Sequence, residues 1–294
     1  MARKEIKGDD LLYRFFNEVL PEHPELIEKI PRMLILSMSI WFPTSVYQEM
    51  PVLLPWVLRD PKCRSKKSKG KVIEPDQWAA PNRDGYLRDD NSLVKGLPKS
   101  LAISSARYPF VNGRHLGGEF VASHIWRKNL SGTLASRVPI LNTFVPNLVW
   151  LPSQVAKLSD REDGPFQTVL KEISWAVYRD LPLSDRARVV AENSWSLLPQ
   201  PTNTPKLLDE ELNWFVSTPR FIKTRKAKLA RVLEALGQLE DNQPVSDKLD
   251  PSRYREGLPS VSLSSRQKLR SDLEIHLDSD SSNRISIEVD RSPN

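Results

Sequence analysis

His124 is a candidate for proton-transfer chemistry because of its position at the end of a patterned run. The run 119–126 alternates apolar and polar residues after the glycine pair 117–118, which predicts a strand that ends at His124. An imidazole has an unperturbed pKa of about 6.5, so its neutral form can take a proton from water near pH 7. The sequence therefore predicts a general base held at a strand end.

Asn147 lies in a second apolar run, 144–151, which predicts a further strand. Pro152 follows this run, and proline suits the first turn of a helix because its missing N–H would have no partner there. The segment 117–163 therefore predicts strand, loop, strand and helix. In this arrangement the two strands deliver His124 and Asn147.

This arrangement resembles the HNH (His-Me finger, ββα-metal) endonucleases. The resemblance rests on His124 in Ser-His-Ile-Trp, on Asn147 in Asn-Leu-Val, and on the predicted helix after it. It implies that His124 activates water as the general base and that Asn147 braces the loop that holds it. It also implies one divalent metal ion, Mg²⁺ by expectation, and hydrolysis of DNA phosphodiester bonds in restriction, defence or repair.

The resemblance implies positions for the metal ligands, and this chain departs from the family at several of them. The residue before the general base is Ser123, where the family commonly has Asp or His. The first helical position falls on Val155 or Ala156, which have no ligating atom, and the second falls on Asp160. Ser123 and Asp160 are therefore the candidate ligands. Carboxylates elsewhere that would complete the set are Glu119, Asp163, Asp89 and Asp90, although helix capping is the commoner role of the last two.

Positive charge surrounds the predicted finger. The net charge is +6 and the sequence pI is about 9.3, which favours a polyanionic partner such as DNA. Arg127 is a candidate to stabilise the transition-state phosphate, as is Lys157. The basic stretch 62–71 either contacts phosphates or is a solvated linker. The basic first half of a predicted helix over 220–240 either lies along a phosphate backbone or is the solvated face of a helix that binds a partner or packs on the core. The residues expected to contact nucleic acid are Lys66, Lys67, Lys69, Lys157 and Lys226.

Two other functions remain open from the sequence. A degenerate finger with basic helices would bind nucleic acid or a partner protein without cutting, and the residues at the ligand positions favour this alternative. A helical interaction protein, in which His124 and Asn147 are purely structural, is the third. The sequence contains no phosphate-binding loop, no Gly-x-Ser-x-Gly, no His-Glu-x-x-His and no Cys-x-x-Cys that would indicate another chemistry.

The cysteine content and the apolar segments of the sequence indicate where the protein is located. The single cysteine, Cys63, excludes a disulfide framework and a cysteine-ligated zinc. The first residues are charged with no apolar core behind them, so no secretory signal is predicted. The longest apolar run, 33–43, is too short to span a bilayer. We expect a cytoplasmic protein that does not bind membranes, and a homo-oligomer remains possible.

The predicted fold class is α+β and mainly helical, with a small ββα-metal finger embedded among helices and a disordered C-terminal tail. Helical periodicity is expected over 11–20, 24–30, 31–41, 165–198 and 220–240. From residue 241 the aromatic residues vanish after Tyr254 and polar residues dominate, which is typical of disorder. The predicted regions are a helical 1–60, a mobile basic loop 61–84, a finger with supporting helices 85–200, a basic helical segment 201–240 and the tail 241–294.

Overall fold

The structure is a computed structural model of the chain. It describes residues 18–19, 22–23, 26, 29–63, 66–68, 71–73, 77–203 and 212–277. Within these residues, no helix is long and apolar enough to cross a membrane.

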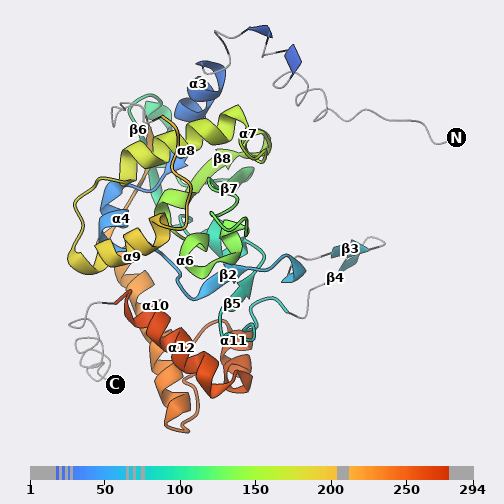
Figure 1. Ribbon diagram of the computed structural model, residues 1–294, viewed down its shortest axis with the longest axis vertical. Helices are drawn as coiled ribbons and strands as arrows, with labels where there is room; N and C mark the ends of the chain where they lie inside the picture. The colour runs from blue at the N-terminus through green and yellow to red at the C-terminus, as the bar shows by residue number, and fades with distance from the viewer. Residues whose placement is uncertain are drawn as a thin grey trace, which may run out of the picture.

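The largest sheet is five-stranded and mixed, in the order β6-β9-β1-β8-β7. Its strands β6, β7 and β8 are labelled in the upper half of Figure 1. The pair β1 and β9 is parallel, and the other neighbours are antiparallel. Because β7 and β8 are adjacent, residues near 124 and near 147 come together at one end of the sheet. The strands are β1 (Ile40–Trp41), β6 (Ala102–Ser105), β7 (Phe120–His124), β8 (Leu148–Pro152) and β9 (Asn213–Val216).

Helices cover the sheet and extend beyond it. In Figure 1, α10, α11 and α12 gather at the lower end of the molecule, away from α3 and α8 at the top. The helices are α3 (Lys29–Met38), α4 (Thr44–Glu49), α5 (Ser92–Gly96), α6 (Pro139–Asn142), α7 (Ser153–Leu158), α8 (Pro165–Tyr178), α9 (Asp185–Trp195), α10 (Pro219–Glu240), α11 (Ser252–Gly257) and α12 (Leu263–Glu274). Two small sheets pair β2 (Val57–Arg59) with β5 (Leu87–Asp89), and β3 (Lys66–Ser68) with β4 (Lys71–Ile73).

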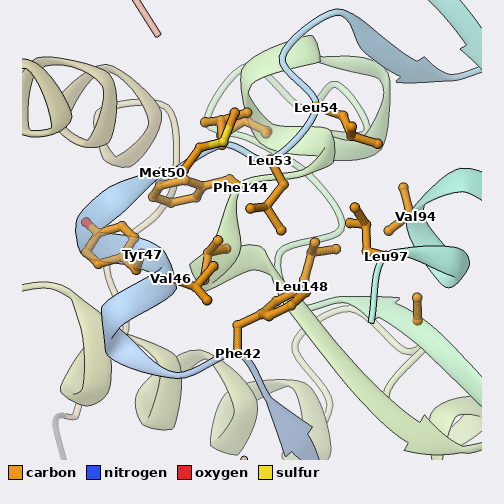
Figure 2. Close-up of a cluster of buried hydrophobic side chains, with 14 of the residues drawn as sticks. Phe42, Val46, Tyr47, Met50, Leu53, Leu54, Val94, Leu97, Phe144 and Leu148 are labelled. Atoms are coloured by element: carbon orange, nitrogen blue, oxygen red, sulfur yellow. The ribbon is translucent and has the colours of Figure 1, made fainter. Parts of the chain in front are cut away.

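One continuous hydrophobic core holds these elements together. Figure 2 shows part of it, where Phe42, Tyr47, Phe144 and Leu148 meet from α4, β8 and the segments beside them. The rings of Phe42 and Trp150 pack edge to face with centroids 5.2 Å apart, a favoured aromatic geometry. The strand β8 is buried along most of its length, which explains why its sequence is a continuous apolar run rather than an alternating one.

The mainly helical α+β prediction is confirmed at the level of class, since helices and a mixed sheet share the core. The expectation of a wholly helical 1–60 is wrong, because β1 and β2 lie within it. The apolar run at Ile40 and Trp41 is buried on both sides, and periodicity alone does not distinguish such a strand from a buried helix. The predicted helix 11–20 lies outside the described residues except for Glu18 and Val19.

The prediction of a disordered tail from residue 241 is wrong as far as residue 277. The segment contains α11 and α12, and Tyr254, Leu269 and Leu273 on them are buried. The hydroxyl of Tyr254 donates a hydrogen bond to the carbonyl of Gly85 at 2.8 Å. The apolar residues here are few, but their spacing places them on one face, against α10. Residues 278–294 lie outside the description.

Two further segments differ from expectation. The stretch predicted as a loop in 61–84 contains the antiparallel pair β3 and β4, which projects from the rest of the chain in Figure 1. The predicted helical region from 201 contains the strand β9 before α10 begins at Pro219. The predicted basic helix 220–240 and the helices within 165–198 are confirmed.

Candidate active site around His124

A strand–strand–helix unit brings the predicted residues together. The strands β7 and β8 pair in an antiparallel register that sets His124 opposite Leu148. The helix α7 follows β8 directly and packs against both strands. The predicted order of strand, loop, strand and helix is therefore confirmed, with Asn147 ending a 3-10 turn just before β8 rather than lying within the strand.

The imidazole of His124 is held by one hydrogen bond from its Nε2 atom. That nitrogen lies 2.9 Å from the backbone carbonyl oxygen of Asn142. Because a carbonyl oxygen only accepts, Nε2 must carry the proton in this contact. In the neutral ring Nδ1 is then the unprotonated nitrogen.

Asn142 and Asn147 are buried asparagines that fix the backbone around His124. The side-chain amide of Asn142 donates to the carbonyl of Val57 at 3.0 Å, which ties α6 to β2. Asn147 accepts a 2.7 Å bond from the N–H of Trp126 through Oδ1 and donates a 3.0 Å bond to Leu141 through Nδ2. Asn147 therefore spans the loop between the two strands, and this contact set matches the bracing role expected of it.

Burial holds His124 in its neutral form. Burial, with a smaller contribution from the positive charge of Arg59, lowers the pKa of the imidazole to about 4. The hydrogen bonds with Asn142 oppose this shift without reversing it. At neutral pH the ring is therefore a base that has not yet taken a proton, although the low pKa makes it a weak one.

Arg59 is a residue of this site that the sequence did not indicate. It ends β2, is half-buried, and acts on His124 through its charge. A second connection comes from Asn91, whose amide donates to the carbonyl of Ala122 in β7 at 3.3 Å. The sequence spacing of Arg59 and Asn91 does not link them to His124. The segments that carry them come close to β7 only through tertiary packing.

Two of the four carboxylates considered as helpers, Asp89 and Asp90, are structural. Asp89 is fully buried and accepts hydrogen bonds from the backbone N–H groups of Asn91 and Leu93 and from Ser92 and Trp78. Asp90 accepts from the N–H of Ser92. These contacts cap the start of α5, which confirms capping as their role. Burial raises the pKa of Asp89, and its hydrogen bonds oppose that shift.

The expected metal positions do not form a ligand set. The prediction that Asp160 lies on the helix is wrong, because α7 ends at Leu158 and Asp160 is exposed in the following turn. The hydroxyl of Ser159 satisfies the carbonyl of Ala156 at 2.8 Å and ends the helix early. Val155 and Ala156 are buried in the core, and no group of three or more His, Cys, Asp or Glu able to hold an ion occurs in the described part of the chain. Ser123 lies in β7, one position before His124.

The predicted cations lie in different surroundings. Arg127 is half-buried three positions after His124, and no described carboxylate forms a salt bridge with it. Lys157 is exposed on α7. Lys226 lies 3.4 Å from the carboxylate of Glu49, so it is not a free surface cation. The side chains of Lys66 and Lys67, and all of Lys69, lie outside the described residues.

Comparison with known proteins gives no relative for this arrangement. No family model matches the chain, and no curated protein and no solved structure is significantly similar to it.

Proposed function

We propose that this chain is a phosphodiesterase that cuts DNA, with His124 as the general base of an HNH-like strand–strand–helix unit. The observation that carries the proposal is the hydrogen bond from His124 Nε2 to the Asn142 carbonyl, because it leaves Nδ1 as the proton acceptor. An oriented base of this kind typically contributes about 10²–10⁴-fold to the rate.

In the proposed reaction, His124 takes a proton from a water molecule through Nδ1. The resulting hydroxide attacks phosphorus, and the bond to the leaving oxygen breaks. Arg59, whose charge acts on His124, and Arg127, three positions after His124, would neutralise the charge that develops on the phosphate oxygens. Asn142 and Asn147 hold the ring and its loop still, so little ordering is needed as the reaction begins.

Substrate binding would correct the low basicity of His124. The pKa of the free ring is about 4 partly because Arg59 repels the protonated form. A bound phosphodiester brings a negative charge that offsets Arg59, so the pKa of His124 rises toward the working pH. The base is then weak in the free protein and stronger once DNA is bound.

A second candidate is a finger that binds nucleic acid without cutting it. The buried Val155 and Ala156 favour it, since they occupy the helical positions where the family carries a metal ligand. This protein would show salt-dependent binding, which is typical of contacts to phosphates.

Incubation of the purified chain with supercoiled plasmid separates the two candidates. The reactions contain Mg²⁺, Mn²⁺ or EDTA, and a mobility-shift assay at low and high salt runs beside them. Nicking that disappears in the His124→Ala variant supports the phosphodiesterase. A salt-sensitive shift with no nicking under any of the conditions supports the binding protein and contradicts the first proposal.

A further inference from the structure

A cavity of about 370 Å³ lies among the end of α4, the start of α9, the middle of α10 and the residues after α12. Its volume falls within the range of small-molecule sites, about 300–1,000 Å³. None of its lining residues takes part in the hydrogen bonds around His124. We call this space the α9 cavity.

Positive groups converge on the α9 cavity. Arg186 lines it, is half-buried, and has no salt bridge to any carboxylate in the described residues. Lys226 lines it from α10, with its Nζ atom 3.4 Å from the carboxylate of Glu49, which also lines the cavity and is 60% exposed. The helix α9 is 11 residues long and begins here, so its dipole favours an anion, while Ser184 already accepts from the N–H of Ala187 and Asp185 lies in the first turn.

A buried polar atom without a partner marks the same place. His276 lines the α9 cavity, and its Nε2 is buried with no hydrogen-bond partner in the described chain. Burial, with a further contribution from Arg186, lowers the pKa of this ring to about 4, while Asp272 opposes the shift. Nε2 is therefore an unused donor or acceptor beside the cavity.

The remaining walls are partly apolar. Met50, Val190 and Ile275 line the α9 cavity beside the charged groups. A site with a few convergent polar groups on an apolar wall is typical of a pocket for an organic anion. Glu49 is the one acidic residue in the lining. Its repulsion of an anion is reduced because the charge of Lys226 offsets its own.

We propose that the α9 cavity binds a small organic phosphate. The phosphate would be held by Arg186, Lys226 and the start of α9, and the body of the ligand would pack on Met50 and Val190. The site joins α4, α9 and α10 to the end of α12, so an occupied cavity would hold the C-terminal helices against the rest of the protein. This inference does not depend on the phosphodiesterase activity.

Isothermal titration calorimetry with phenyl phosphate, inorganic phosphate and phenol tests the proposal on the full chain. Phenyl phosphate should bind with a Kd of about 1 mM or below. Inorganic phosphate should bind about tenfold more weakly, because it buries no ring, and phenol should not bind. No saturable heat from phenyl phosphate up to about 10 mM would overturn the proposal.

Matched variants locate the site. Arg186→Gln should weaken phenyl phosphate binding by about tenfold or more, since a charge-assisted hydrogen bond is lost. Arg188→Gln is the control on the same helix, because Arg188 is exposed and does not line the cavity. Lys226→Gln gives a second variant from another helix, and circular dichroism confirms that each variant is folded. Equal affinity in wild type, Arg186→Gln and Lys226→Gln would contradict the assignment.

Discussion

The Nε2 atom of His124 lies 2.9 Å from the carbonyl oxygen of Asn142, although the two residues are 18 positions apart. The side chain of Asn142 continues the connection to Val57 at 3.0 Å. The ring orientation is therefore set by α6 and β2 as well as by its own strand. A substitution that moves one of these elements should therefore change the orientation of the His124 ring.

Replacement of Asn147 should lower the stability of the fold. In Asn147→Ala the buried N–H of Trp126 and the carbonyl of Leu141 lose their partners. Each unsatisfied group typically costs about 1–3 kcal/mol, so the free energy of unfolding should fall by about 2–4 kcal/mol. Urea unfolding measures this change. Asn193→Ala on the exposed side of α9 is the control, and its free energy of unfolding should stay close to that of the wild type. A loss no larger than that of the control would remove the bracing role.

The charge of Arg59 should be visible in the titration of His124. Arg59→Gln removes a positive neighbour that disfavours the imidazolium form, so the pKa of His124 should rise from about 4. Nuclear magnetic resonance of the ring nitrogens follows the titration directly. Arg137→Gln is a suitable control, because Arg137 is exposed and is not among the charges that act on His124. An unchanged or lower pKa in Arg59→Gln would separate Arg59 from the site.

Acid should destabilise the fold through two histidines. His124 and His276 each have a folded-state pKa of about 4, below the value of about 6.5 expected in the unfolded chain. The unfolded state therefore binds more protons between these values, and stability is lost as pH falls from about 6.5 to 4. Each histidine should account for a loss of about 2 kcal/mol between pH 7 and pH 5.

Urea unfolding of wild type and of His124→Gln at both pH values isolates one of these contributions. The loss of stability between pH 7 and pH 5 should be smaller in the variant by about 2 kcal/mol. An equal loss in both proteins would show that His124 titrates normally in the folded state.

The C-terminal helices should contribute to stability. Leu273 on α12 is 1% exposed, so Leu273→Ala leaves a cavity and should cost about 2–5 kcal/mol. Leu263 begins the same helix and is 50% exposed, so Leu263→Ala should change the free energy of unfolding by less than about 0.5 kcal/mol. Thermal or urea unfolding compares the two. Equal small effects would mean that α12 does not pack as described.

The sequence predicted local order well and long-range contacts poorly. The pairing of β7 with β8 and the helix after them followed from apolar runs and from Pro152, because those signals are local. The strand β1 escaped prediction because it is two residues long and owes its existence to β8 and β9 on either side.

The same limit applies to the site. His124 and Asn147 lie within one contiguous segment, so their spacing carried a signal. Arg59 and Asn142 reach His124 only through the packing of β2 and α6, and no periodicity records that contact. The helices after residue 241 were missed because their few apolar residues, such as Leu269 and Leu273, are diluted in a polar composition.

The most direct test of the account is the rate at which wild type and His124→Ala nick supercoiled plasmid, measured beside His115→Ala. His115 is an exposed histidine that pairs with Ala102 at the opposite edge of the sheet, so it controls for loss of an imidazole. We expect a loss of about 10²–10⁴-fold in His124→Ala, an unchanged rate in His115→Ala, and folded proteins throughout. Equal nicking by wild type and His124→Ala would contradict the assignment of His124 as the base.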